Sequence, residues 1–242
     1  MICFRASEDF SLGLERTGGF ETVAFCEIED YPRRVLAKYW PGIPIYDDVR
    51  TLTADALRRD GIAVDVICGG FPCQDVSFAG RRAGLEGARS GLWSEYARLI
   101  GELRPRYVLV ENVPGLLSLG VGAVLGDLSA LGYDAEWHCI PAGHVGASHE
   151  RDRVWIIAYP DKEGRPDTKG RQGQTEPSWR QILTADDVGC RPSERSPEPA
   201  MVRVVDVFSA DVDAVAALGN AVVPQIPELI GRAILKAEGL AA

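Results

Sequence analysis

The feature of this sequence that most constrains its fold is an alternation, between Thr22 and Tyr159, of short apolar runs with amphipathic stretches. Alternation of this kind is typical of an α/β fold in which helices cover both faces of a mostly parallel sheet. We predict strands at residues 22–27, 64–68, 107–111, 134–140 and 154–159. We predict helices at residues 31–39, 92–103 and 121–131, and a closing helix at residues 226–237.

Two predicted strands read like members of a parallel sheet that is buried on both faces. Residues 64–68 and 107–110 are almost continuously apolar, as strands covered by helices on both sides are. The helix predicted at residues 92–103 repeats apolar residues at helical spacing, with Tyr96, Leu99 and Ile100 at its centre. The predicted fold class is therefore α/β, with a doubly wound, mostly parallel sheet.

The composition changes after Tyr159, and this change suggests how the chain is divided. Residues 160–199 are rich in Pro, Gly, Thr and charged residues, so they bury little surface by themselves. Apolar character returns near Met201. We expect one main domain from residues 1–160 and 214–242. The interval 161–213 is then a linker, a partly disordered insert or a reduced substrate-reading module.

The charge of the chain limits the ways in which it could bind nucleic acid. A formal net charge of −9 argues against a protein that coats nucleic acid indiscriminately, because neutralising phosphates needs local positive charge. A site-directed DNA enzyme is still compatible with it. All but four of the 26 basic residues are arginine, which suits forked contacts with phosphate and guanine. An arginine-rich proteome would give the same bias.

Cysteine usage and hydropathy predict an intracellular protein. No export signal is seen near the start, and no apolar run approaches the about 20 residues that cross a bilayer, so we expect a cytoplasmic protein without a membrane segment. Six cysteines are scattered without short paired spacings, which favours free thiols over disulfides and makes a structural zinc site unexpected.

Two segments that follow predicted strands carry side chains suited to catalysis. Cys73 lies in the run Gly-Gly-Phe-Pro-Cys-Gln of residues 69–74, directly after an apolar strand, and Glu111 ends the next predicted strand. Open α/β sheets place ligands at the carboxyl ends of their strands, so the two side chains should share one edge. Taken singly, Cys73 could be a buried residue in a tight turn and Glu111 a helix cap. Together they suggest a nucleophile with an acid beside it.

Four short segments then resemble the DNA cytosine-5 methyltransferase family, and they occur in the family's order. They are Phe-Pro-Cys-Gln at residues 71–74, Glu-Asn-Val at 111–113, Arg-Asp-Arg at 151–153 and Gly-Asn-Ala-Val-Val-Pro at 219–224. The resemblance covers residues 1–160 and about 214–242. It implies a Rossmann-like methyltransferase fold with a reduced second subdomain, in which 161–213 form a short target-recognition region. It also implies a monomer that acts on double-stranded DNA with S-adenosylmethionine.

The resemblance assigns a catalytic role to each of four residues. The Cys73 thiolate would add to carbon 6 of a cytosine that has been flipped out of the duplex, which makes carbon 5 nucleophilic. Glu111 would bind ring nitrogen 3 and the exocyclic amine. Arg151 and Arg153 would orient the base and its phosphate, with Arg153 at the ring oxygen. These two arginines could instead be a surface pair at the end of a loop.

Cofactor contacts are implied in the same way. Glu27 would bond the ribose hydroxyls, and Ile28 would pack on the adenine. Asp48 would accept a hydrogen bond from the adenine amine, although the adjacent Asp47 could take that role if the alignment is shifted by one residue. Any of these acids could instead be an ordinary loop residue. The remaining cofactor residues implied by the resemblance are Phe4, Val49, Pro72, Leu92, Asn220 and Val222.

The first loop departs from the family pattern Phe-x-Gly-x-Gly-Gly. The first strand is clipped, with only residues 1–4 ahead of the loop. Residues 4–10 read Phe-Arg-Ala-Ser-Glu-Asp-Phe, so all three glycines are absent. Glu8 and Asp9 place side chains and negative charge where the family brings backbone amides to the cofactor's carboxylate. We therefore expect weaker cofactor affinity than is usual in the family. Two explanations fit the change. The amino terminus could be degraded, or the protein could be a functional variant in which Arg5 and local amides hold the cofactor's carboxylate.

Three other functions stay open at this point. A catalytically weakened or inactive family member would bind DNA without turnover, as the altered first loop suggests. A thiol-dependent oxidoreductase would use Cys73 and need a resolving cysteine nearby, for which Cys68 is the neighbour in sequence. An enzyme acting on RNA would use the same thiolate chemistry.

Overall fold

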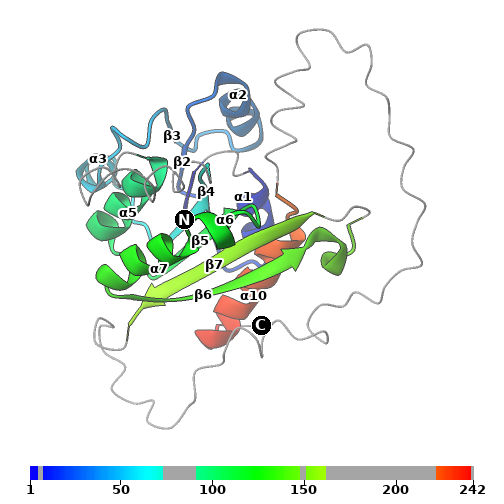
Figure 1. The fold of residues 1–242 in the computed structure, drawn as a ribbon. Coiled ribbons are helices and arrows are strands. Elements are labelled where there is room, and N and C mark those ends of the chain that lie inside the picture. The colour runs from blue at the N-terminus through cyan, green and yellow to red at the C-terminus, as the bar shows by residue number, and fades with distance from the viewer. Residues whose placement is uncertain (5–7, 73–90, 148–150, 162–221, 241–242) are drawn as a thin grey trace, which may run out of the picture.

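A seven-stranded sheet organises the residues that this computed structural model describes, which are 1–4, 8–72, 91–147, 151–161 and 222–240. Its strands, in chain order, are β1 (Ile2–Phe4), β2 (Ala24–Cys26), β3 (Ile45–Tyr46), β4 (Val66–Gly70), β5 (Tyr107–Asn112), β6 (Tyr133–Pro141) and β7 (Asp152–Pro160). Across the sheet the order is β3-β2-β1-β4-β5-β7-β6 (Figure 1). The first five are mutually parallel, whereas β7 runs antiparallel to both of its neighbours.

Helices cover both faces of this sheet, as the doubly wound prediction requires. One face carries α1 (Glu8–Glu15), α2 (Asp30–Tyr39) and α10 (Gln225–Ala237), whose apolar residues share a core with alternate strand residues. The other face carries α3 (Ala54–Arg59), α5 (Leu92–Leu103), α6 (Leu116–Leu119) and α7 (Val121–Ala130). A short 3-10 turn, η2 (Ala142–Val145), follows β6. Figure 1 shows α1 and α10 side by side behind the sheet and α5 and α7 in front of it.

The amphipathic patterns explain where the helices form and which side they bury. In α5, the residues Trp93, Tyr96, Leu99 and Ile100 are buried, and the helix ends where Arg104 adopts a left-handed conformation. In α10, residues spaced by three and four positions face α1 and the sheet. Burying a large apolar side chain stabilises a fold by about 1.5–3 kcal/mol, so these stripes hold both helix layers in place.

The strand order reverses between β1 and β4, and this reversal fixes where a ligand site can form. From β1 the chain moves outward to β2 and β3, and it then returns to β4 and moves outward on the other side. Open α/β sheets bind ligands at the carboxyl ends of the strands beside such a reversal. Gly69 lies there with φ +153°, and a Cβ on it would stand 2.5 Å from the carbonyl oxygen of Phe4. Only glycine lets β4 approach β1 so closely.

The predicted elements agree with the structure in type, and most differences are at their ends. Helix 92–103 has the predicted bounds, and β6 and β7 extend one or two residues beyond the prediction at each end. The prediction missed α1, β3, α3 and α6, which are short. Among the described residues, no helix is both long and apolar enough to span a membrane.

Candidate active site

Glu111 lies near the carboxyl end of β5, and it forms an ion pair with Arg153. Its Oε1 is 2.7 Å from the Nε of Arg153, and the two side chains are only 12% and 18% exposed. A pair with so little water around it is screened weakly, so its two charges fix one another's position. The Nη1 of Arg153 also donates to the carbonyl oxygen of Asp152, at 2.8 Å.

The antiparallel direction of β7 explains why Arg153 reaches the acid. Because β7 runs against β5, its first residues lie at the carboxyl edge of the parallel strands. Glu111 pairs directly with Trp155 across the ladder. Arg153 precedes Trp155 by two residues and therefore shares the face of the sheet with Glu111. The structure brings Glu111 and Arg153 together, a pair that our sequence interpretation did not foresee.

Arg151 lies just before β7, among the same charges. Burial lowers the pKa of its guanidinium first, the like charge of Arg153 lowers it further, and the carboxylates of Glu111 and Asp9 oppose the shift. Its carbonyl oxygen accepts a hydrogen bond from the amide of Ala142, which fixes the start of β7 beside η2. Arg151 thus lies within electrostatic range of Arg153 and of two acids at this edge.

Asn112 joins the end of β5 to the segment that leads into Cys73. Its Nδ2 donates to the carbonyl oxygen of Phe71 at 2.8 Å, and its Oδ1 accepts from the amide of Val113 at 2.9 Å. A Cβ on Gly70 would lie 3.2 Å from Oε2 of Glu111, so the end of β4 passes directly against the acid. Our sequence interpretation missed Asn112, although its place between Glu111 and Val113 was a usable signal.

Two of the predicted site residues, Cys73 and Asn220, lie outside the described residues. Pro72 is described and is half-buried after Phe71, whose ring packs on Trp93 at a centroid distance of 5.0 Å. The contact holds the start of the Pro-Cys segment against α5.

The end of β2 carries a buried acid followed by an exposed apolar residue. Glu27 is 3% exposed, and its Oε1 accepts from the amide of Glu29 at 2.8 Å. Ile28, in contrast, is 56% exposed, which is unusual for so apolar a side chain. Burial raises the pKa of the neighbouring Cys26 thiol to about 12, with Asp48, Glu27 and Asp47 adding to the shift and Arg33 opposing it.

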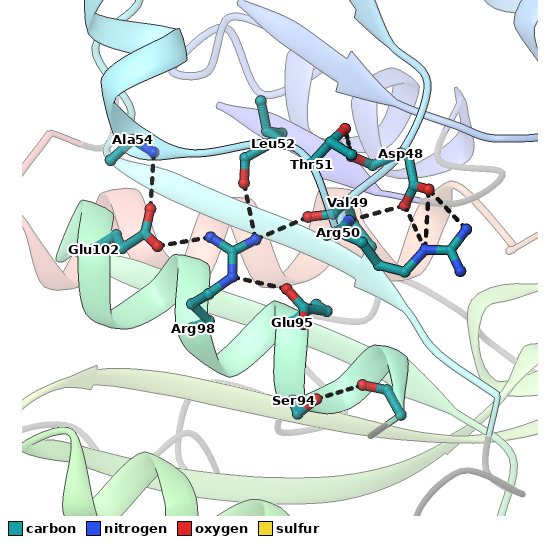
Figure 2. Close-up of polar contacts among 11 residues, drawn as sticks. Asp48, Val49, Arg50, Thr51, Leu52, Ala54, Ser94, Glu95, Arg98 and Glu102 are labelled. Carbon is teal, nitrogen blue, oxygen red and sulfur yellow. Dashed lines mark hydrogen bonds and ion pairs between the residues drawn. The ribbon is translucent and has the colours of Figure 1, made fainter. Parts of the chain in front are cut away.

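Asp48 follows β3 at the same edge, and it is engaged by Arg50 (Figure 2). Its Oδ1 accepts from the amide and the Nε of Arg50 at 2.9 Å each, and its Oδ2 accepts from Nη2 at 2.7 Å. These hydrogen bonds hold the pKa of the Asp48 carboxyl below its ordinary value. The contact is local and exposed, since Arg50 is 60% exposed.

Arg98 of α5 holds the loop after Asp48 against the helix (Figure 2). Its Nη2 donates to the carbonyl oxygens of Val49 and Leu52 at 2.9 and 2.8 Å. Its Nε and Nη1 pair with Glu95 and Glu102 at 2.7 Å each, and Glu102 in turn accepts from the amide of Ala54 at 2.9 Å. The sequence interpretation did not include Arg98, although its spacing from Glu95 and Glu102 predicts both helix pairs.

The other predicted cofactor residues occupy the same end of the sheet. Phe4 is 4% exposed at the end of β1, where its ring meets that of Tyr96 at 5.2 Å. Leu92 begins α5 and is half-buried against the core. Val222 is 7% exposed, and its amide donates to Oδ2 of Asp9 at 2.8 Å. Asp9 therefore bonds to backbone near the carboxyl end of the chain, a contact that our sequence interpretation did not foresee.

The described cysteines count against the oxidoreductase alternative. Cys68 and its strand neighbour Cys3 are both fully buried, and burial raises the pKa of the Cys68 thiol, with Cys3 adding to the shift. A protonated thiol inside the core is neither nucleophilic nor accessible. Of the cysteines that the structure describes, only Cys139 is exposed, and it lies on β6.

The strand order and the helices on both faces define a Rossmann-like α/β fold, and comparison with a solved methyltransferase structure agrees. A mutant of DNMT2 from Spodoptera frugiperda superposes with a TM-score of 0.55 at 19% identity, over 71% of this chain and 53% of that one. The family model described as C-5 cytosine-specific DNA methylase matches residues 4–188. The chain belongs to this family.

Curated relatives match over part of their own length. The type II methyltransferase M2.BsuMI of Bacillus subtilis is 36% identical over 155 residues, which are 61% of this chain and 38% of that protein. The type II methyltransferase M.Eco47II of Escherichia coli is 32% identical over 191 residues, which are 76% of this chain and 44% of that protein. The match therefore spans less than half the length of either relative.

Proposed function

We propose that this protein methylates carbon 5 of cytosine in double-stranded DNA with S-adenosylmethionine as methyl donor. One observation carries the proposal. Glu111 is held at the sheet edge by Arg153, at 2.7 Å, and the next residue, Asn112, bonds the carbonyl of Phe71 at 2.8 Å, two positions before Cys73. An acid and the approach to a thiol are thus joined at the place where α/β sheets bind ligands.

Cys73 and Glu111 divide the activation of the base between them. The thiolate of Cys73 adds to carbon 6, and the electrons of the carbon 5–carbon 6 double bond move to carbon 5 and the ring. Glu111 donates a proton to nitrogen 3, which accepts part of that charge. After carbon 5 has taken the methyl group, its proton passes to solvent water, and the electrons left behind restore the double bond and expel the thiolate. Nitrogen 3 returns its proton to Glu111.

Arg153 and Arg151 orient the acid and the base. The Nε of Arg153 holds Oε1 of Glu111, so the carboxyl group faces the base in one orientation. In the described part of the chain, the Nη2 of Arg153 donates to no other group, and we assign it to the ring oxygen of cytosine. Arg151 adds positive charge for a phosphate. Because carbon 6 is inaccessible within a base stack, the cytosine must be flipped out of the duplex first.

The residues at the strand reversal fit S-adenosylmethionine. Gly69 lets β4 pass close against β1 at this reversal, Glu27 is a buried acid at the end of the second strand, and Ile28 is an exposed apolar surface beside it. We assign Glu27 to the ribose hydroxyls and Ile28 to the adenine ring, with Asp48 at the adenine amine. Phe4, Val49, Pro72, Leu92, Asn220 and Val222 complete this proposed pocket. When bound, the cofactor supplies an electrophilic methyl group on its sulfonium.

The division of the chain belongs to the same proposal. Residues 1–160 and 214–242 form the catalytic domain, and residues 161–213 form a short region that reads the target sequence. The packing of α10 on α1 supports the first part, because it places the last helix against the first.

A methyl-transfer assay with the full chain tests the proposal. The protein is incubated with duplex DNA and S-adenosylmethionine that carries a labelled methyl group. We expect label in 5-methylcytosine, its loss in Cys73→Ser, and its retention in Cys139→Ser, the matched variant of an exposed cysteine. Bisulfite sequencing then locates the target. If the wild type binds DNA but never labels it, the result would favour the alternative of an inactive family member that binds DNA without turnover.

A further inference from the structure

Asp9 connects two parts of the chain that are far apart in sequence. It lies in the first turn of α1, is half-buried, and accepts a hydrogen bond from the amide of Val222 at 2.8 Å. The two residues are 213 positions apart. A hydrogen bond to a charged acceptor is stronger than one between neutral groups, so this contact fixes the backbone of Val222 against α1.

The surroundings of this hydrogen bond are shaped to keep it in place. A Cβ on Gly13, one turn along α1, would lie 2.2 Å from the carbonyl oxygen of Pro224. The ring of Phe10 packs on Trp155 at a centroid distance of 5.3 Å, which ties the same turn of α1 to β7. Asp9 therefore lies where α1, the segment before α10 and the start of β7 meet.

Asp9 also contributes a charge to the cluster around Glu111. Arg151 is within electrostatic range of Asp9 and Glu111, which attract it, and of Arg153, which repels it. Glu111 is already paired with Arg153 at 2.7 Å. Asp9 therefore adjoins the charged residues at the edge of the sheet where Glu111 lies.

We propose that Asp9 is a positioning residue for the cofactor site, because its carboxylate holds the backbone of Val222 against α1. The contact of Val222 with the cofactor rests on the proposed function, whereas the hydrogen bond concerns the fold alone. In this chain an acid thus joins α1 to the carboxyl-terminal segment, at a position where the family pattern has a glycine.

Two variants separate the hydrogen bond of Asp9 from its charge. Asp9→Asn keeps an oxygen that accepts from the Val222 amide but removes the charge, whereas Asp9→Ala removes both. Asp134→Asn and Asp134→Ala are the matched controls, since Asp134 is an exposed acid on β6. Both Asp9 variants should fold, because the contacts of α10 with Gly13 and with Leu14 do not involve Asp9.

Hydrogen exchange of the Val222 amide, followed by NMR on the full chain, tests whether Asp9 holds this backbone. We expect exchange about tenfold faster in Asp9→Ala than in its Asp134 control, whereas exchange in Asp9→Asn should stay within about twofold of the wild type. Equal exchange in Asp9→Ala and Asp134→Ala overturns the proposal. The outcome does not depend on whether the protein methylates DNA.

Steady-state methylation tests the effect on the cofactor site. We expect the KM for S-adenosylmethionine to be about fivefold higher in Asp9→Ala than in Asp9→Asn, because both variants lack the charge and only Asp9→Ala releases Val222. Equal KM values in the two variants overturn the role of Asp9 in the cofactor site. A wild type without methylation overturns the proposed function, and the exchange of Val222 still decides whether the hydrogen bond holds the backbone.

Discussion

Two carboxylate–arginine pairs lie at the same edge of the sheet, and they are built in different ways. Glu111 and Arg153 come from neighbouring strands and are 12% and 18% exposed. Asp48 and Arg50 are two residues apart in one loop and are 21% and 60% exposed. The first pair forms only when β7 is paired with β5, whereas the second pair requires only a local turn.

The difference indicates how each half of the site is held in place. On the side of Glu111, strands and a nearly buried ion pair fix the acid itself. On the side of Asp48, the local pair cannot place the loop, and Arg98 does so from α5 by binding the carbonyl oxygens of Val49 and Leu52. We therefore expect substitutions on the first side to affect the chemical step and those on the second side to affect cofactor binding.

Removing the acid should give the largest effect. In Glu111→Gln we expect the single-turnover rate of methylation to fall by about 10² to 10³-fold, because the amide cannot donate a proton to nitrogen 3. Glu238→Gln is the control, since Glu238 bonds the hydroxyl of Tyr107 at the opposite end of β5, at 2.6 Å. A Glu111→Gln protein within tenfold of the control would remove the acid from the mechanism.

Loss of the link between β5 and the Pro-Cys segment should come next. In Asn112→Ala the buried carbonyl of Phe71 loses its donor, so we expect the free energy of unfolding to fall by about 2 kcal/mol. The methylation rate should fall about tenfold as well, because the approach to Cys73 loosens. Denaturant unfolding and single-turnover kinetics measure the two effects. Asn112→Asp keeps the oxygen that accepts from the amide of Val113 but lacks the donor to Phe71. If the bond to Phe71 accounts for most of the effect, Asn112→Asp should lose as much stability and rate as Asn112→Ala does.

Releasing the loop after Asp48 should affect binding rather than chemistry. In Arg98→Leu we expect the KM for S-adenosylmethionine to rise about tenfold and kcat to stay within about twofold, because the loop loses two hydrogen bonds from a charged donor. Arg58→Leu, which breaks an exposed pair on α3, is the matched control. A fall in kcat without a change in KM would contradict the division between the two sides.

Breaking the exposed pair should have the smallest effect. In Arg50→Ala the pKa of Asp48 should rise back toward its ordinary value, which a carbon-13 NMR titration of its carboxyl group measures. A lowered carboxyl pKa stabilises the fold above the ordinary pKa, and the effect is lost as the pH falls through the folded-state value. At pH 7 the carboxylate is ionised in both proteins, so cofactor affinity should agree within about twofold. A larger loss would mean that Arg50 contacts the cofactor itself.

Long periodic elements could be predicted from the sequence, and tertiary contacts between distant residues could not. The helix at residues 92–103 has the predicted bounds because one apolar stripe runs its whole length. The short helix α3 was missed, although Thr53 accepts from the amide of Ala56 and is a readable helix cap. The direction of β7 could not be predicted, because hydrophobic patterning does not encode strand direction.

The same limit applies to the candidate site. Glu111 could be placed at the carboxyl edge, since it ends an apolar strand, whereas the place of Arg153 depends on the direction of β7. The bonds from Asn112 to Phe71 and from Val222 to Asp9 join residues 41 and 213 positions apart, and no local pattern encodes such pairings. The roles of the predicted site residues remain proposals for the experiments above.

Covalent trapping on DNA that contains 5-fluorocytosine tests the central claim most directly. Fluorine at carbon 5 cannot leave as a proton does, so the thiolate that has added to carbon 6 stays attached after methyl transfer. We predict a complex that survives denaturation with the wild type and with Cys139→Ser, formed only when S-adenosylmethionine is present, and none with Cys73→Ser. A complex that persists in Cys73→Ser, or that never forms with the wild type, would contradict the account.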